Sequence, residues 1–216
     1  MKVNTEEVKR IIKEIKPATL VAATKYVGIN EIEQLDETGV KIFGENKVQS
    51  LLEKYDQYHG SGEFHMIGTL QTNKVKYIID KVTLIHSVDR ISLLKEIQKQ
   101  AKKQEIVMPV LIQVNIAKED SKHGFMIEEI DSLFASLKLY PNIEVRGLMM
   151  MAPNREAKEI ETYFEETKIL LKHLQTKYNK DMYKELSMGM SNDYLLALKH
   201  GATYIRIGSS LFKSDG

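Results

Sequence analysis

A lysine stands directly after an apolar run near the start of the chain, in the segment LVAATKYVG (20–28). A strand rich in apolar residues has no structural need for a strongly hydrated ammonium at its end, which makes Lys25 a candidate for chemistry. Partial desolvation would favour the neutral amine, which attacks carbonyl carbons and forms Schiff bases. The structural alternative is a lysine at the rim of the fold that extends its amine into water, and the residue type alone leaves both open.

Two segments containing glycine and serine near the C-terminal end could bind an anion. In YIRIGSSLF (204–212), Gly208 lets backbone amides approach a ligand closely, and Ser209 adds a hydroxyl donor where a short helix could begin. In LSMGMSNDY (186–194), Gly189 and Ser191 lead into the next helix in the same way. Each segment alone could be a tight turn with a capping serine. Because the two follow neighbouring strands, together they favour a shared phosphate site.

Arg206 lies within the last apolar run rather than after it. Strand alternation places it on one face with Tyr204 and Gly208, and places Ile205 and Ile207 on the other. If the isoleucines pack under helices, the guanidinium points into the fold, where a permanent cation needs a partner. That partner is either a buried acid or a ligand that offers an anion or an aromatic nitrogen, and the sequence does not choose between them.

Other polar residues have ordinary structural explanations. Glu45 and Asn46 follow the run VKIFG, where we expect Glu45 to favour the start of a helix. His65 and His86 lie within apolar runs, so we expect them to be hydrogen-bonded core residues. The six histidines form no HxH or HExxH pattern and cysteine is absent, so we expect neither a metal site nor a thiol nucleophile.

Composition limits the class of protein. The 216 residues are 43% hydrophobic and 28% charged, which suits a globular fold with a buried core. A net charge of +1 argues against a nucleic-acid-binding surface. Residues 1–16 read as a charged amphipathic helix and not a signal peptide, and no apolar run is long enough to cross a membrane. We therefore expect a cytoplasmic protein, which the absence of cysteine also fits.

Eight short apolar runs alternate with segments of helical periodicity. The runs cover 19–24, 40–44, 64–68, 82–87, 109–115, 144–150, 185–188 and 204–208. The helical segments between them cover 29–38, 45–58, 71–80, 89–103, 127–139, 155–178 and 192–200. This alternation predicts parallel strands, and eight units predict an α/β (β/α)8 TIM barrel formed by residues 1–216 as a single domain. An open, doubly wound sheet is the alternative. In a barrel, the residues that follow the strands meet at one mouth.

Capping signals mark several helix boundaries. Ser87 to Asp89 can cap the helix that follows the fourth run, and Ser191 to Asp193 can cap the helix that follows the seventh. Gly201 is placed to end that second helix, because glycine readily adopts the left-handed conformation found after a helix.

The order of these motifs resembles the pyridoxal 5′-phosphate (PLP) homeostasis proteins, the YggS/PROSC group, which share the fold of the N-terminal barrel of alanine racemase. The matching segments are VAATKYV, FGENKVQ, FHMIGTLQTNK, IHSVDR, VLIQVNIAKEDSKHG, VRGLMMMAP, LSMGMSNDY and IRIGSSLF. They run in order from about residue 20 to residue 212, so the resemblance covers nearly the whole chain.

The resemblance implies a PLP site. Lys25 would hold PLP as a covalent internal aldimine, and Arg206 would face the pyridine nitrogen. The residues that the resemblance places against the phosphate are Ser191, Gly208 and Ser209. This assignment would explain why a lysine follows the first strand.

Other positions match the family less directly. Asn46 matches a pocket residue near the ring, and Lys122 falls in the family's S-K-x-G loop without an assigned role. The chain departs from the common pattern at Thr24, which replaces a serine, at Val27, where a second lysine is common, and at Thr69, which replaces a histidine. The terminal segment RIGSSLFK also stands where RIGTAIFG is usual. These departures affect secondary contacts and not Lys25.

The resemblance further implies a role in intracellular PLP (vitamin B6) and amino-acid homeostasis, with PLP-dependent apo-enzymes as candidate recipients. An arginine at the pyridine nitrogen favours the unprotonated ring, which is a weak electron sink. We expect no second domain that would bring a further base or a dimer interface, and so expect a monomer without strong turnover. Two alternatives remain: a weak PLP-dependent amino-acid racemase, and a PLP-free sugar-phosphate-binding barrel enzyme with Glu45 as its candidate base.

Overall fold

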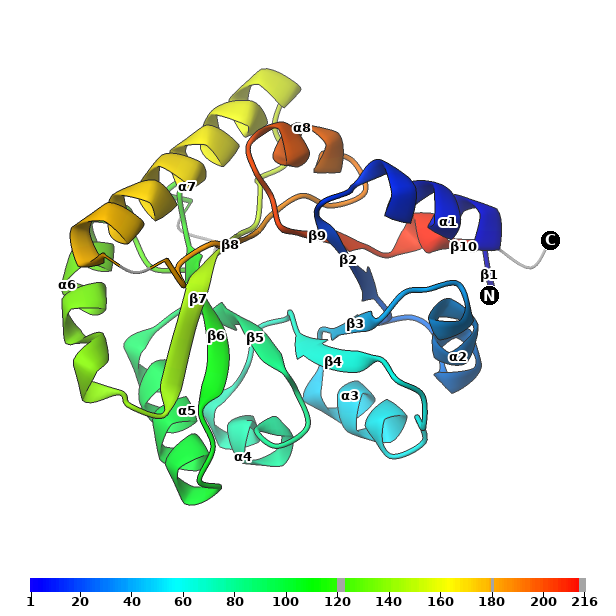
Figure 1. The fold of residues 1–216 in the computed structure, drawn as a ribbon, viewed down its shortest axis with the longest axis horizontal. Helices are drawn as coiled ribbons and strands as arrows, with labels where there is room; N and C mark the ends of the chain where they lie inside the picture. The colour runs from blue at the N-terminus through cyan, green and yellow to red at the C-terminus, as the bar shows by residue number, and fades with distance from the viewer. Residues whose placement is uncertain (120–122, 180, 214–216) are drawn as a thin grey trace.

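The computed structural model describes residues 1–119, 123–179 and 181–213, and its eight parallel strands close into a barrel. The strands of the barrel are β2 (Thr19–Ala23), β3 (Ile42–Glu45), β4 (Glu63–Met66), β5 (Leu84–Val88), β6 (Met108–Val114), β7 (Ile143–Met150), β8 (Glu185–Ser187) and β9 (Tyr204–Ile207). Each strand pairs with the next along the chain, and β9 pairs with β2 to close the ring (Figure 1). The closed ring confirms the predicted TIM barrel and excludes the open sheet.

Helices lie outside the ring and cover it (Figure 1). They are α1 (Thr5–Glu14), α2 (Ile29–Glu37), α3 (Val48–Tyr55), α4 (Val75–Ile78), α5 (Ile91–Lys103), α6 (Ile127–Ser136), α7 (Ala157–Tyr178) and α8 (Tyr194–Lys199). Short 3₁₀ turns are η1 (Thr72–Lys74), η2 (Leu137–Leu139) and η3 (Ser209–Leu211). Within the described residues, none of the helices combines the length and apolarity needed to cross a lipid bilayer.

Alternation along the strands divides the core into an outer and an inner part. On β2, Leu20 and Ala22 point outward into the large core beneath the helices, whereas Val21 points inward and packs with Ile42 and Ile67. A second inner cluster consists of Leu84, Leu111 and Met149. These inner side chains fill the barrel in layers, as is usual for this fold. The next inward position on each strand, toward its carboxyl end, therefore faces the mouth.

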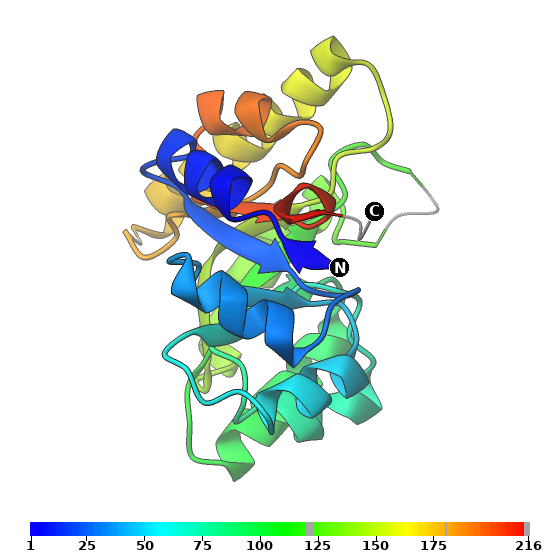
Figure 2. The ribbon, with the colours of Figure 1, turned by 90° about the vertical axis from the view of Figure 1, so that its right-hand side faces the viewer.

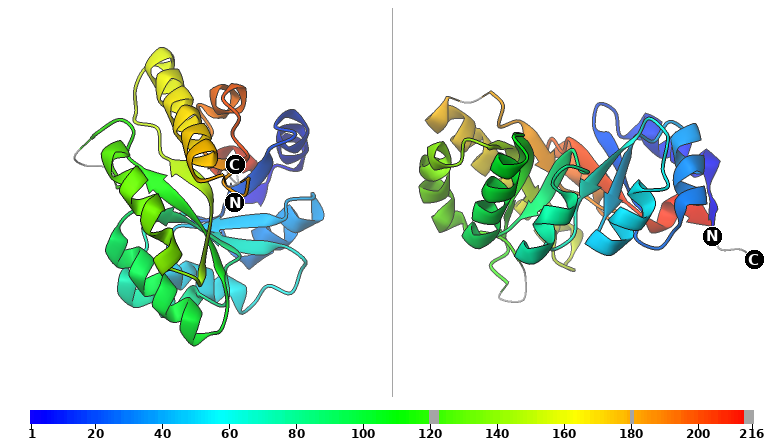
Figure 3. Two further views of the ribbon diagram at one scale, coloured as in Figure 1. Left: turned by 60° about the vertical axis from the view of Figure 1, so that its left-hand side comes forward. Right: turned by 90° about the horizontal axis from the view of Figure 1, so that it is seen from below.

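A short sheet that the sequence did not predict joins the two ends of the chain. β1 (Lys2–Val3) pairs antiparallel with β10 (Phe212–Lys213), so only residues 5–14 of the expected N-terminal helix are helical. In Figure 2 the first residues, in blue, lie beside the last described residues, in red. Figure 3 shows the same proximity from two further directions. The pairing brings Met1 to the side of the barrel where β9 ends.

Two of the predicted caps do not form as expected. Ser87 and Asp89 do not cap α5, because Ser87 belongs to β5 and donates its hydroxyl to the Gly68 carbonyl at 2.6 Å. On α8, Asp193 stands at the N-cap position, but its carboxylate accepts a hydrogen bond from the preceding Met190 amide at 2.6 Å and not from an amide of the helix. Gly201 follows α8 with a φ of +83°, as predicted.

Candidate functional site

A cavity of about 480 Å³ opens at the carboxyl ends of the strands. Its lining includes all six residues that the resemblance assigns to a PLP site: Lys25, Asn46, Ser191, Arg206, Gly208 and Ser209. The rest of the lining is largely apolar: Met1, Ala23, Tyr26, Ile67, Met151, Met190 and Phe212. The volume lies within the range of about 300–1,000 Å³ that is usual for small-molecule and cofactor sites. The predicted convergence at one mouth is therefore present.

Lys25 lies just beyond the end of β2, and its side chain is exposed. We expected partial desolvation of the amine, and burial by the protein alone does not provide it. The chain turns outward after β2, and the Val27 amide donates to the Thr24 carbonyl at 3.1 Å. Nζ of Lys25 lies 4.6 Å from the centroid of the Tyr26 ring, which is 74% exposed. The amine is accessible on the cavity wall, where such an exposed cation–π contact contributes about 0.5–1 kcal/mol.

The backbone that carries Lys25 is fixed from behind by a buried ion pair. Lys54 of α3 is 6% exposed and donates to the Thr24 carbonyl at 2.6 Å and to Oε1 of Glu45 at 2.5 Å. The fully buried Glu45 carboxylate also accepts hydrogen bonds from the hydroxyls of Thr24 and Ser50. A buried ion pair is tolerated where further hydrogen bonds satisfy both charges. These contacts hold the peptide that precedes Lys25 in one position.

The expected role of Glu45 at a helix N-terminus is therefore wrong. Glu45 is the last residue of β3, and α3 begins only at Val48. Strand alternation turns Gly44 toward the inside of the barrel and Glu45 outward, toward Lys54. Glu45 does not line the cavity, so the candidate base of the sugar-phosphate alternative is not in place.

Arg206 points into the barrel, as the alternation predicted, with Ile205 and Ile207 in the outer core. The side chain is 4% exposed, and its guanidinium donates to Ser187 Oγ at 2.5 Å and to the Met150 carbonyl at 2.9 Å. Desolvation lowers the pKa of Arg206 to about 10, which leaves it charged at neutral pH. Among the described residues, no carboxylate lies within ion-pair distance of it. A buried acid in direct contact with Arg206 is thus not observed, and the buried Asp193 carboxylate acts on it only by longer-range attraction, which raises the pKa of Arg206.

Three of the lining residues, Ser191, Gly208 and Ser209, lie on the loops after β8 and β9, and together they are the candidate anion cradle. Ser209 opens the 3₁₀ turn η3, whose first amides have no partner within the turn. A Cβ atom at Gly208 would lie 3.3 Å from the Ala23 carbonyl oxygen, so any larger residue would fill space between two lining residues. Hydroxyls, backbone amides and a buried cation nearby suit a phosphate and an aromatic ring nitrogen.

Asn46 can line the cavity because the backbone at Gly68, which has no side chain, packs closely against it. A Cβ atom at Gly68, just beyond β4, would lie 2.3 Å from the Asn46 carbonyl oxygen. Two of the departures from the family pattern have no place in the lining, since Thr69 is exposed and Val27 is buried elsewhere. Lys122 lies outside the described residues.

Sequence reasoning missed several residues of the site. Met1 and Phe212 reach the rim through the β1–β10 pairing, for which two-residue strands leave no periodic signal. Tyr26 was visible beside Lys25, and its aromatic ring could have been read as a contact for the amine. Lys54 gave no signal, because a lysine near the end of a helix is usually exposed to solvent. The described residues bring together no group of three His, Asp or Glu side chains arranged to hold a metal ion.

Comparison with known proteins identifies the family. Residues 1–215 match the family model for the N-terminal domain of alanine racemase. The pyridoxal phosphate homeostasis protein of Aquifex aeolicus is 45% identical over 197 residues, covering 90% of this chain and 86% of that protein. The chain belongs to the pyridoxal phosphate homeostasis protein family. The family member from Escherichia coli is 32% identical over 206 residues, covering 90% of this chain and 84% of that protein.

Solved structures agree with this family membership. PipY of Synechococcus elongatus with PLP bound has a TM-score of 0.90 at 28% identity, covering 97% of this chain and 99% of PipY. Alanine racemase from Clostridium difficile has a TM-score of 0.77 at 15% identity and matches over 58% of its length, which shows a shared fold alone. The fold and the family expected from the sequence motifs are thereby confirmed.

Proposed function

We propose that this chain binds PLP in the cavity at the mouth of the barrel, covalently through Lys25, and acts in PLP and amino-acid homeostasis. The observation that carries the proposal is the convergence of six residues, predicted from motifs spread over residues 25–209, on one cavity of cofactor size. The family membership and the PLP bound to PipY support the same ligand.

Each residue present fits a part of this cofactor. PLP, when bound, supplies an aldehyde that reacts with amines and a ring that withdraws electrons. Lys25 offers an accessible amine, and the Glu45–Lys54 pair keeps its backbone in place for covalent attachment. The anion cradle of Ser191, Gly208 and Ser209 would hold the phosphate. Arg206 would donate to the ring nitrogen, and Asn46 would contact the ring.

The same residues argue against strong turnover. Arg206 remains charged at neutral pH, so it favours an unprotonated ring nitrogen and a weak electron sink. Racemisation needs acid and base groups on both faces of the substrate. Within the described part of the chain, the lining contains no carboxylate and no histidine, and its titratable side chains are Lys25, Tyr26 and Arg206. We therefore place a carrier role ahead of the weak-racemase alternative.

The deciding experiment is a visible absorbance spectrum of the protein with PLP, followed by borohydride reduction and peptide mapping by mass spectrometry. The expected result is a yellow protein whose reduced adduct lies on the peptide that contains Lys25. A protein that takes up no PLP would overturn the proposal and return attention to a PLP-free phosphate site. Rapid exchange of the α-proton of alanine in deuterated water would instead favour the racemase.

The proposal extends to partners and location. We propose that residues 1–216 act as a single cytoplasmic domain, that the protein is a monomer, and that it passes PLP to PLP-dependent apo-enzymes. Light scattering after size-exclusion chromatography tests the oligomeric state. Activation of an apo-enzyme by the loaded protein, compared with free PLP at the same concentration, tests the transfer.

A further inference from the structure

A chain of buried polar side chains crosses the inside of the barrel and ends at Arg206. Arg206 Nη1 contacts Ser187 Oγ at 2.5 Å, and Ser187 Oγ lies 2.7 Å from His86 Nδ1. His86 Nε2 lies 2.9 Å from His65 Nδ1. The four residues sit on β9, β8, β5 and β4, all at inward positions, and Ser187 and His86 are fully buried. The proposed cofactor role uses Arg206 but leaves the other three without a function.

The donor and acceptor of each hydrogen bond in this series can be assigned by starting from the charged residue, Arg206. A guanidinium has donors only, so Ser187 Oγ must accept from Arg206 and can give its own proton to His86 Nδ1. His86 Nδ1 is then an acceptor, and the ring carries its proton on Nε2. That N–H donates to His65 Nδ1, so His65 also carries its proton on Nε2. Every contact in the chain then joins one donor to one acceptor.

The opposite direction leaves groups unsatisfied. If His86 donated from Nδ1, the fully buried Ser187 hydroxyl would have no acceptor among the contacts of the chain. His65 would then donate from Nδ1 and turn an unprotonated Nε2 toward Oε1 of Glu63, which lies 3.6 Å away. Two acceptors would face each other there, at a distance beyond a direct hydrogen bond. A buried polar group without a partner loses its hydrogen bonds to water and gains none in return, which selects the first direction.

We propose that Ser187, His86 and His65 are positioning residues that hold the Arg206 guanidinium in one plane through a one-way hydrogen-bond chain, with both histidines neutral and protonated on Nε2. Burial supports the neutral form, because it lowers the pKa of His65 and of His86. With Nη1 fixed by Ser187 and Nη2 by Met150, the remaining N–H groups keep a fixed direction toward the cavity. The link to PLP rests on the proposed function, whereas the proton assignment does not.

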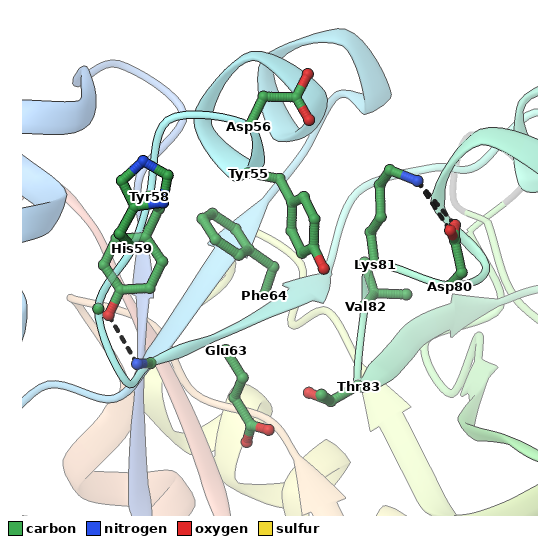
Figure 4. Close-up of a pocket in the computed structure, with 12 residues that line it drawn as sticks. Tyr55, Asp56, Tyr58, His59, Glu63, Phe64, Asp80, Lys81, Val82 and Thr83 are labelled. Atoms are coloured by element: carbon green, nitrogen blue, oxygen red, sulfur yellow. Dashed lines mark hydrogen bonds and ion pairs between the residues drawn. The ribbon is translucent and has the colours of Figure 1, made fainter.

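The hydrogen-bond chain that starts at Arg206 ends beside Glu63, at the end of the barrel opposite the mouth. Glu63 begins β4 and lines a second cavity, of about 570 Å³, among the loops that enter the strands (Figure 4). His65 beside it lowers the pKa of the Glu63 carboxyl, so the chain ends on an anion as it begins on a cation. Every hydrogen bond in the chain points from Arg206 toward Glu63.

The test of the proton assignment is a long-range ¹H–¹⁵N correlation spectrum of the full-length protein, labelled with ¹⁵N-histidine and free of PLP, at pH 7.5. The expected result is the Nε2–H pattern for His65 and His86. In Ser187→Ala, His86 loses its donor and should become a mixture of tautomers, while His173 and His200, which contact acidic side chains on other elements, keep their patterns. An Nδ1–H or doubly protonated His86 in the unmodified protein would overturn the proposal, as would an unchanged His86 in the variant.

The test of positioning uses PLP affinity and the absorbance maximum of the loaded protein. Ser187→Ala should weaken PLP binding about tenfold and move the maximum, because Arg206 loses a fixing contact. Ser187→Cys keeps a weak donor of similar size and should recover part of both effects. Ser132→Ala, which removes an exposed hydroxyl on α6, is the matched control.

Folding of each variant is checked by its thermal midpoint, and His86→Gln replaces Ser187→Ala if the latter does not fold. A folded Ser187→Ala or His86→Gln protein with unchanged affinity and spectrum would overturn the positioning role. If the unmodified protein bound no PLP, the proposed function would be wrong. The tautomers of His65 and His86 would still show whether the proton assignment is correct.

Discussion

The two ends of the barrel each hold a cavity of similar volume, about 480 Å³ at the mouth and about 570 Å³ at the opposite end. The mouth cavity gathers residues from Met1 to Phe212, including glycine, serine and a buried arginine. The other is lined by two nearby segments, 55–64 and 80–83. Some of its polar groups pair with one another: Lys81 with Asp80, and the Gly62 amide with the Tyr58 hydroxyl (Figure 4).

This comparison shows that the volume of a cavity alone does not identify the ligand site in this fold. At the mouth, residues from distant parts of the chain converge at the strand ends, whereas at the other end the lining comes from two neighbouring segments, some of whose polar groups pair with one another. This agrees with the general placement of chemistry at the carboxyl ends of barrel strands. Matched substitutions at the two ends can test the contrast, from the largest expected effect to the smallest.

The largest difference is expected between two lysines. Lys25→Ala should abolish the borohydride-reducible PLP adduct, because no other lysine among the described residues lines this cavity. Lys81→Ala, in the cavity at the opposite end, should leave the adduct unchanged. The measurement is the mass of the reduced protein. An adduct of full yield in Lys25→Ala would contradict the assignment.

The next comparison concerns two ion pairs. Lys54→Ala should lower the free energy of unfolding by about 3–5 kcal/mol, because it leaves the buried Glu45 carboxylate without its cation. Loss of the Lys81–Asp80 pair, whose side chains are 25% and 49% exposed, should change stability by about 0–1 kcal/mol. Urea unfolding of both variants measures the difference. Equal losses in the two variants would show that the buried pair adds nothing beyond a surface pair.

A smaller effect is expected from single hydroxyl groups. Ser209→Ala should increase the rate of PLP release about tenfold, because one donor to the phosphate is lost. Thr83→Ala removes a hydroxyl from the cavity at the opposite end and should not change that rate. Stopped-flow transfer of PLP to an excess of an acceptor amine follows the release. Identical rates in the two variants would remove Ser209 from the anion cradle.

The smallest effect concerns pH. His86 has a lowered pKa in the fold, with His65, Arg206 and Tyr204 as the charged or titratable groups that face it. Below a pH of about 6.5 the unfolded chain binds a proton at this histidine and the folded protein does not, so stability falls as the pH falls. The loss is at most about 1.4 kcal/mol per pH unit for one histidine.

Urea unfolding at pH 7.5 and pH 5.5 should therefore show a shallower loss of stability in His86→Gln than in the unmodified protein. His59→Gln, which replaces an exposed histidine of the opposite cavity, should keep the full pH dependence. An identical slope in all three proteins would mean that His86 takes up a proton without unfolding.

Local pattern was enough to predict the barrel and the inward direction of Arg206. Each strand carries its own alternation, and the closed ring then brings the strand ends together without further information. The buried ion pair of Glu45 and Lys54 was not predictable in the same way. It depends on where one lysine of α3 lies relative to β2 and β3, and helical periodicity does not encode that distance.

The errors at Ser87 and Glu45 have a common cause. Both are polar residues near the end of a strand, and a capping preference was the strongest local explanation for each. In the folded chain each had a buried partner from another element, Gly68 for Ser87 and Lys54 for Glu45. Tertiary hydrogen bonds therefore outweighed the local preference.

The pairing of β2 with β9 has a mechanical consequence. It is the seam where the ring closes, and it joins residues near 20 to residues near 206, with Val21 opposite Arg206 and Ala22 opposite Ile207. Lys25 lies on one side of the seam, and Gly208 and Ser209 lie on the other. A ligand held from both sides would connect the first and last strands of the barrel and so stabilise the pairing that closes the ring. Because such a ligand binds the closed ring and not the opened one, it would shift the equilibrium toward the closed ring.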